Sequence, residues 1–233
     1  MSVQDSDTLD AFMAKLERTH GDRGGVSCAQ VVDKGIFTDE PLVGELVFSL
    51  LLWEASLAHA VRGASRLNEE LVNLNELRVC TPEEITGMLG GRYPRGMERS
   101  HRMLTVLQQI FERENAVSLA RLKEMNKPDV GAYLASLESP PSFAASRVVL
   151  LGLGWHAFPV DDRLNRLLVR TEIVEPCPST RTQSQRLERL VRANDSLRYY
   201  TLIEHWSQSQ RGPRSGSSNG SSKPAGAAAK GAS

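Results

Sequence analysis

Apolar side chains recur three and four residues apart through most of this chain, and this spacing is the strongest constraint on its fold. Leu9, Met13 and Leu16, for example, fall on one face of a helix expected over Thr8–His20, with Asp7 as its cap. Stretches that alternate apolar and polar residues, as strands do, are few. Leucine is abundant, whereas aromatic residues make up only 6% of the chain. We therefore expect an all-α protein in which helices pack against helices.

The segment Leu42–Val61, which follows Pro41, is apolar nearly all round. A helix without a polar face is buried, so we expect this segment to form the central helix of the core. Its longest apolar run, Leu46–Leu52, is far shorter than the roughly 20 residues that span a bilayer. The polar segment Met1–Asp10 lacks the apolar centre of a signal peptide. These features predict a cytoplasmic protein without membrane contact.

Further helices are predicted from start signals and apolar spacing. Thr81-Pro82-Glu83-Glu84 combines a capping residue, a proline in the first turn and carboxylates that the helix dipole favours, so a short helix is expected there up to Met88. The other expected helices are Arg99–Glu114, Pro128–Glu138, Phe143–Leu151, Arg163–Arg170, Thr182–Arg192 and Ser196–Gln208.

The end of the chain, residues 211–233, consists almost entirely of Gly, Ser, Ala, Pro and Lys. These residues bury too little apolar surface to offset the entropy lost on ordering. We expect a disordered tail that either has no function or acts as a weak tether to phosphate.

The cysteines Cys28, Cys80 and Cys177 are widely separated and odd in number. This spacing fits neither a disulfide framework nor a set of metal ligands, and it is typical of a protein from a reducing compartment. We expect no metal site and no other cofactor.

Four residues, Ser139-Pro140-Pro141-Ser142, separate two of the predicted helices, and such a short connection forces them into a tight hairpin. Gly152-Leu153-Gly154 and an aromatic-rich connector follow, and Pro159-Val160-Asp161 then opens another helix. This order resembles the endonuclease III class of helix-hairpin-helix DNA glycosylases. In that family a hairpin precedes the catalytic aspartate, which lies in a Val-Asp stretch. Asp161 stands at the position of that aspartate.

The resemblance implies a catalytic role for Asp161. Its carboxylate would stabilise the positively charged sugar of the transition state and orient a water molecule for hydrolysis of the glycosidic bond. Asp161 also has the sequence context of an ordinary helix N-cap, and the two roles are compatible. Bifunctional members of the family carry a lysine 18 residues before the aspartate, where this chain has Phe143. A phenyl ring cannot form a Schiff base, so lysine-dependent lyase chemistry is not expected.

The resemblance also suggests DNA contacts at the hairpin and in the core helix. The family hairpin offers backbone N–H groups to a phosphate, and Ser139 and Ser142 are the candidates here, although the prolines between them have no N–H. Glu54 stands where relatives carry a glutamine that fills the gap left by a flipped base. A carboxylate at that place would be repelled by phosphate, so Glu54 is expected either to read bases differently or to form an internal ion pair.

Charge is unevenly distributed although the formal net charge is +0. Residues 1–141 carry 15 basic and 21 acidic side chains, whereas residues 142–214 carry 11 and 7, so an anionic partner would meet the C-terminal half. Arg163 and Arg166 lie three residues apart on one helical face, and Arg147 is expected beside them. We expect these three side chains to contact the DNA backbone. The alternative is a solvated or salt-bridged face.

The resemblance implies a two-lobed domain over residues 1–210. The central lobe is expected over about 50–155 and the second over 1–49 together with 156–210, with Asp161 in the cleft between them. The four-cysteine loop that binds an iron-sulfur cluster in many relatives is missing after His205, so no cluster is expected.

The resemblance suggests a monofunctional DNA glycosylase that acts on damaged duplex DNA in base-excision repair and is associated with the nucleoid. This function requires Asp161 to be exposed on the wall of a DNA-sized cleft. The alternative is a catalytically inactive relative that serves as a DNA-binding or protein-interaction module. A third possibility is an unrelated helical domain, in which the hairpin and the cleft would be absent. The oligomeric state stays open.

Overall fold

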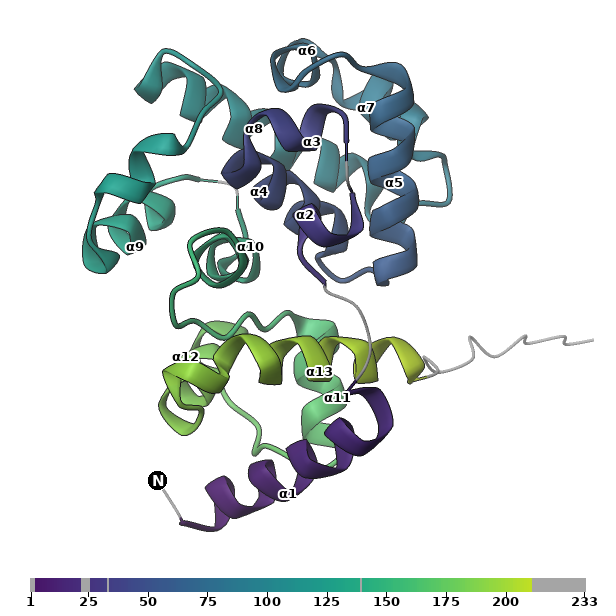
Figure 1. The fold of residues 1–233 in the computed structure, drawn as a ribbon. Coiled ribbons are helices and arrows are strands. Elements are labelled where there is room, and N and C mark those ends of the chain that lie inside the picture. Colours follow the sequence, from purple (N-terminus) through teal and green to yellow (C-terminus); the bar gives the residue numbers. More distant parts are fainter. Residues whose placement is uncertain (1–2, 22–25, 33, 139, 211–233) are drawn as a thin grey trace, which may run out of the picture.

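The computed structural model describes residues 3–21, 26–32, 34–138 and 140–210, and within these ranges it contains helices and no strand (Figure 1). In chain order the elements are α1 (Val3–His20), α2 (Cys28–Val31), α3 (Ile36–Asp39), α4 (Pro41–Leu52), α5 (Leu57–Glu70), α6 (Leu74–Val79), α7 (Pro82–Leu89), α8 (Gly96–Glu114), η1 (Ala120–Glu124), α9 (Lys127–Ala135), α10 (Ser142–Arg147), η2 (Val148–Gly152), α11 (Asp162–Arg170), α12 (Thr180–Leu190), η3 (Ala193–Asp195) and α13 (Ser196–Ser209). The predicted all-α class is confirmed. The predicted disordered tail, residues 211–233, lies outside the described residues.

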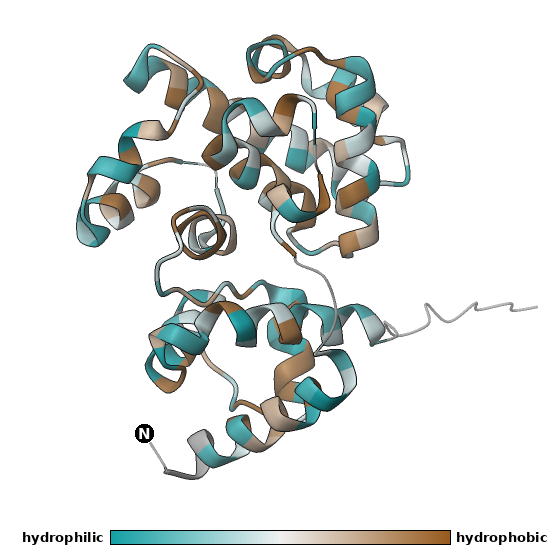
Figure 2. Cartoon of the chain, in the orientation of Figure 1, coloured by the Kyte–Doolittle hydropathy of each residue, from teal (hydrophilic) through white to brown (hydrophobic). Residues whose placement is uncertain are grey.

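Helix α4 lies at the centre of the larger of two hydrophobic clusters. All of its residues from Leu42 to Leu52 are buried, because α2, α3, α5, α8 and α10 pack around it. The prediction of a buried core helix is therefore confirmed for this part of the chain. In Figure 2 the coil formed by α10 and η2, which is seen end-on between the two halves of the molecule, has a strongly hydrophobic part at η2, whereas α12 carries many hydrophilic residues.

The predicted core helix is shorter than expected, because the chain turns sharply after Leu52. Ser56 ends this turn and caps α5, since its hydroxyl oxygen accepts a hydrogen bond from the N–H of His59 at 3.2 Å. Within the turn Glu54 adopts a left-handed backbone conformation with φ 52°. The helix expected over Leu42–Val61 is thus two helices, α4 and α5, joined by a strained turn.

Helices α1, α11, α12 and α13 enclose the second cluster, which lies below the first in Figure 1. The N-terminal helix crosses the C-terminal one, and the rings of Phe12 and Trp206 meet edge to face with centroids 5.0 Å apart. Two segments that are far apart in the sequence therefore form one lobe.

The boundary predicted at residue 50 is wrong for the segment 28–49. Ile36 and Val43, which the prediction assigned to the second lobe, are buried in the central cluster. The reason is that α4 is apolar on every side, so α2 and α3 are needed to cover the side that other helices leave open. Of the described residues before α2, those of α1 and Val26 pack with the C-terminal helices.

Two of the helix starts predicted from capping residues can be compared with the structure. Thr81 and Glu84 form a reciprocal capping box at the start of α7, which confirms the predicted signal. Asp7, by contrast, lies inside α1 rather than at its start. Residues 3–7 contain neither glycine nor proline, so nothing stops the helix from extending backwards to Val3.

The two helices of the predicted hairpin, α9 and α10, pack against each other. Pro141 caps α10, which runs directly into the π-helical turn η2 and ends where the N–H of Leu153 bonds to the carbonyl oxygen of Val148 at 3.0 Å. The segment predicted as one helix over Phe143–Leu151 is therefore helical, with a change of hydrogen-bond pattern at Val148.

Within the described parts of the chain, no helix combines the length and the apolar character needed to cross a membrane.

Candidate active site at the junction of the two lobes

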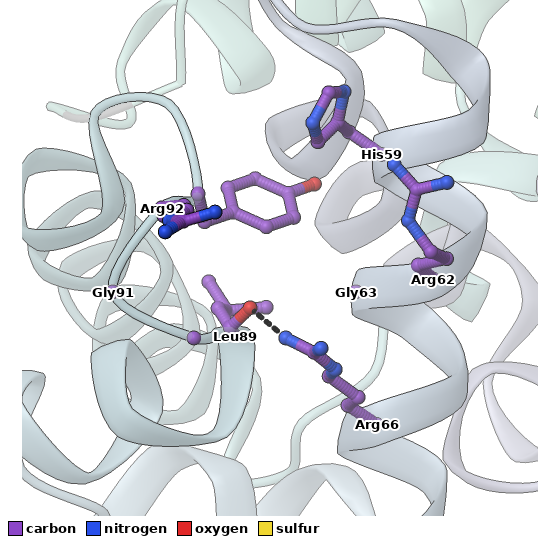
Figure 3. Close-up of a pocket in the computed structure, with 9 residues that line it drawn as sticks. His59, Arg62, Gly63, Arg66, Leu89, Gly91 and Arg92 are labelled. Atoms are coloured by element: carbon purple, nitrogen blue, oxygen red, sulfur yellow. Dashed lines mark hydrogen bonds between the residues drawn. The ribbon is translucent and has the colours of Figure 1, made fainter.

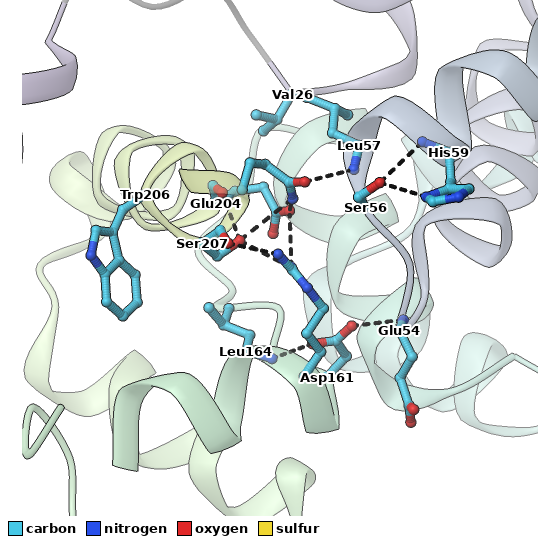
Figure 4. A network of polar contacts seen from close by, with 12 residues as sticks. Val26, Glu54, Ser56, Leu57, His59, Asp161, Leu164, Glu204, Trp206 and Ser207 are labelled. Carbon is cyan, nitrogen blue, oxygen red and sulfur yellow. Dashed lines mark hydrogen bonds and ion pairs between the residues drawn. The ribbon is translucent and has the colours of Figure 1, made fainter. Parts of the chain in front are cut away.

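Asp161 is the N-cap of α11 and lies where the two lobes meet (Figure 4). One carboxylate oxygen, Oδ1, accepts a hydrogen bond from the N–H of Leu164 at 2.7 Å. The other, Oδ2, accepts one from the N–H of Glu54 at 2.7 Å, so the carboxylate joins the second lobe to the turn after α4. The predicted N-cap is confirmed.

The carboxylate of Asp161 is almost completely shielded from solvent, with 5% of the residue exposed. Desolvation raises its pKa to about 6, against the lowering effect of the N–H groups of Leu164 and Glu54, and the nearby Glu204 raises it further. Asp161 is therefore mostly ionised at neutral pH. The exposure that an active enzyme requires of this carboxylate is not present in the free protein.

The turn between α4 and α5 is tied to the second lobe at two points. Besides the bond from Glu54 to Asp161, the N–H of Leu57 donates to the side-chain oxygen of Gln208 on α13 at 2.9 Å. Gln208 in turn donates from Nε2 to Glu204 at 2.5 Å. Both lobes thus meet at a turn whose backbone N–H groups are bound by side chains (Figure 4).

Glu54 is brought next to Asp161 by its backbone, but its side chain takes a different direction. One carboxylate oxygen lies 3.3 Å from the guanidinium of Arg95, and only 10% of the side chain is exposed. Burial raises the pKa of this carboxyl, and the neighbouring carboxylate of Asp162 adds to the effect. The internal ion pair considered from the sequence is therefore present, and base recognition by Glu54 stays a proposal.

Arg147, which we expected at the DNA backbone, is completely buried, so that expectation is wrong. Its guanidinium donates to Glu45 and Ser49 at 2.9 Å each, to the carbonyl oxygen of Val26 at 2.7 Å and to the hydroxyl of Tyr200 at 2.5 Å. A buried charge needs a charged partner, and Glu45 supplies it from α4. Arg147 links the two lobes instead of binding a ligand.

Arg163 and Arg166 lie on α11 as predicted, but in different surroundings. Arg163 donates to the carbonyl and hydroxyl oxygens of Ser207 at 2.7 and 3.1 Å and lies 4.0 Å from Glu204, so it is bound to α13. Arg166 is exposed. Of the two predicted contacts, Arg166 is therefore exposed, whereas the side chain of Arg163 is 23% exposed and bound to α13.

The hairpin supplies a second group of predicted contacts. Ser142 is the first residue of α10 and is half-buried, whereas Ser139 lies outside the described residues. Phe143 is buried in the central cluster, and its ring centroid lies 5.8 Å from the guanidinium carbon of Arg147. The position at which the resemblance places a lysine is therefore part of the hydrophobic core.

The aromatic connector before Asp161 fills space between helices. Phe158 is fully buried in the second cluster and His156 shares a 2.7 Å hydrogen bond with the carbonyl oxygen of Glu188. Trp155 is half-buried against the central cluster. Phe158 and Trp155 therefore serve packing, whereas His156 lies in the wall of a cavity of about 320 Å³ that residues of α9, α10 and α12 also line.

Arg99 is a buried neighbour of the site that the sequence did not single out. It is completely buried and donates to the carbonyl oxygens of Leu50 and Trp53, the latter at 2.8 Å, where α4 ends. A positive side chain at a helix C-terminus is favoured by the helix dipole. Arg99 thereby holds the turn that presents the N–H of Glu54.

No group of three or more His, Cys, Asp or Glu side chains is placed to hold a metal ion in the segments that the structure describes. The three cysteines are free thiols, of which Cys28 is buried.

The fold of this chain is similar to that of several DNA glycosylases of known structure. A non-covalent endonuclease III–DNA complex matches with a TM-score of 0.65 and 13% identity, over 86% of this chain and 85% of that one. A thermostable thymine-DNA glycosylase matches with a TM-score of 0.59 and 13% identity over 90% of each chain. A 3-methyladenine DNA glycosylase of H. pylori, bound to 1,N6-ethenoadenine, matches with a TM-score of 0.60 and 10% identity, over 88% of this chain and 99% of that one.

No protein-family model matches the sequence, and no curated protein matches it either. At 10–13% identity the structural likeness establishes the fold. The predicted endonuclease III-like helical fold is confirmed, and a helical domain of a different fold is excluded.

Proposed function

We propose that this protein binds duplex DNA at the junction of its two lobes and removes a damaged base by hydrolysis, as a step of base-excision repair. The proposal depends above all on one observation, the ionised carboxylate of Asp161 at the start of α11 in a fold shared with DNA glycosylases. A carboxylate there has the charge needed to stabilise the cationic sugar that forms when the glycosidic bond breaks.

Access to Asp161 has to be created when DNA binds. Oδ2 is covered by the N–H of Glu54, whose left-handed backbone conformation costs on the order of 1 kcal/mol. Movement of the turn between Leu52 and Ser56 would relieve this strain and uncover the oxygen. The strain makes the turn a suitable gate, since less energy is needed to open it.

A lyase step is not part of the proposal. Schiff-base chemistry needs a nucleophilic amine, and the buried phenyl ring of Phe143 stands at the matching position. The expected product is free base together with an abasic site in an unbroken strand.

A catalytically inactive DNA-binding protein is the second candidate. The burial of Asp161 and the engagement of both its oxygens by backbone N–H groups favour it. In this case duplex binding would be retained without base release.

Base release from a panel of damaged duplexes distinguishes the two candidates. The panel contains a thymine opposite guanine, 3-methyladenine and 1,N6-ethenoadenine, which follow the names of the structural neighbours, together with an oxidised pyrimidine and an undamaged control. We expect at least one duplex to break after hot alkali but not before it, because hydrolysis leaves an abasic site. Binding to the duplexes without alkali-sensitive breaks in any of them would support the inactive protein instead.

A further inference from the structure

A cavity beside the lobe junction differs from the site of Asp161 in its chemistry. It has a volume of about 310 Å³ and lies between α5 and the loop that follows α7 (Figure 3). Its lining includes His59, Arg62 and Arg66 from α5 and Gly90, Arg92 and Tyr93 from the loop. In Figure 3 Arg62 and Arg66 stand on one side and Arg92 on the other.

The cavity is positively charged, since three guanidinium groups and no carboxylate line it. Arg66 donates to the carbonyl oxygen of Leu89 at 2.5 Å. The guanidinium groups of Arg62 and Arg92 form no ion pair or hydrogen bond with any residue that the structure describes. Burial, together with Arg62 and then Arg99, lowers the pKa of His59. Such a gathering of positive charges around one cavity attracts an anion.

Two glycines allow the walls of the cavity to approach each other. A Cβ atom on Gly63 would lie 2.9 Å from the ring of Tyr93, which the helix could not accommodate at its present distance from the loop. Gly90 has φ 88°, and a Cβ atom on it would lie 2.4 Å from Nη1 of Arg66. The backbone therefore leaves space for the arginines to converge across the cavity.

The cavity is connected to the junction by α5. Ser56 caps this helix and shares a 2.7 Å hydrogen bond with Nδ1 of His59 in the cavity wall, and it follows the turn that bonds to Asp161. At about 1.5 Å per helical residue, Arg62 and Arg66 lie roughly 9 and 15 Å along the helix from Ser56. These distances equal about three to four base-pair rises of duplex DNA.

We propose that the cavity of Arg62, Arg66 and Arg92 binds a phosphate group of the DNA backbone, a few nucleotides from the base at the lobe junction. Guanidinium groups bind phosphate oxygens through paired N–H donors, which suits a site formed by several arginines. The inference rests on the proposed duplex binding and adds to it a fixed phosphate contact on the central lobe, outside the hairpin and α11.

The test measures the affinity of the full-length protein for duplex DNA over a series of salt concentrations. In the double variant R62Q/R92Q both replaced side chains are exposed, so the fold is expected to be retained, and circular dichroism checks it. We expect about a tenfold loss of affinity at low salt. The slope of log affinity against log salt concentration should also be smaller in magnitude by about one unit for each phosphate that the variant no longer neutralises. The control is R121Q, which changes an exposed arginine of η1 that does not line the cavity.

The outcomes separate this inference from the proposed function. If wild type binds duplex and R62Q/R92Q binds it with unchanged affinity and slope, the phosphate site is refuted while duplex binding stands. If wild type does not bind duplex, the proposed function and the phosphate site on DNA both fail. A parallel titration with inorganic phosphate, followed by NMR at the amides of Gly90 and Gly91, distinguishes a DNA phosphate from a free phosphate as the group that binds in the cavity. Saturation by free phosphate without duplex binding would contradict a DNA phosphate and indicate a small phosphate ligand.

Discussion

Replacing Arg147 with methionine is expected to lower the free energy of unfolding by about 3–5 kcal/mol, because it leaves the buried carboxylate of Glu45 without its partner. The same change removes the donors to Tyr200 on α13 and to the carbonyl oxygen of Val26 before α2. The lobes would lose a buried connection as well as an ion pair. Urea unfolding of R147M and wild type, followed by circular dichroism and tryptophan fluorescence, measures the effect.

A double replacement separates the ion pair from simple loss of packing. In E45Q/R147M no unpaired charge is buried, so this variant is expected to be more stable than R147M alone. Burial already raises the pKa of Glu45, and removal of Arg147 raises it further. A carboxyl whose pKa is raised in the folded state adds stability as pH falls, so R147M should be less destabilised at pH 5 than at pH 7. R147M within about 1 kcal/mol of wild type at both pH values would show that the ion pair contributes little to stability.

Asp161→Asn is expected to reduce the rate of base release by about 10²–10³-fold, because the amide cannot neutralise the positive charge of the transition state. Asparagine is a good N-cap, so the bond from Leu164 and the start of α11 should persist. The fold is therefore expected to survive while catalysis does not. Single-turnover release from the duplex that wild type cuts fastest gives the comparison.

Two controls accompany this prediction. Asp162→Asn removes the neighbouring exposed carboxylate and is expected to leave the rate within about twofold of wild type. In addition, kcat/KM of wild type, which reports the pKa of the free protein, should fall about tenfold for each pH unit below 6 as the carboxyl of Asp161 becomes protonated. Equal rates for D161N and wild type, or a rate independent of pH from 5 to 8, would remove Asp161 from the mechanism.

Features set by neighbouring residues were predictable from the sequence. The cap at Thr81 depends on Glu84 three residues later, and the cap at Asp161 depends on the N–H of Leu164, so both are visible in a short stretch of chain. The apolar character of α4 likewise indicated its burial. The fold followed from such local patterns together with the hairpin and Val-Asp resemblance.

Features set by distant residues were not predictable in this way. From the sequence Arg147 was interpreted as a surface cation, because its partners Glu45 and Tyr200 lie 102 and 53 positions away. The bond between Glu54 and Asp161 spans 107 positions, so the burial of Asp161 had no local sign. The cationic cavity likewise forms only when α5 packs beside the loop after α7. A missed signal was Ser56, a capping residue inside an apolar run.

The most direct measurement of the central claim compares two abasic analogues in one duplex, a cationic pyrrolidine and a neutral tetrahydrofuran. It does not require the damaged base to be known. If the carboxylate of Asp161 stabilises a cationic sugar, wild type should bind the pyrrolidine duplex at least about tenfold more tightly at pH 7.5, and D161N should lose that preference. Equal affinity of wild type for both duplexes, or an unchanged preference in D161N, would contradict the account.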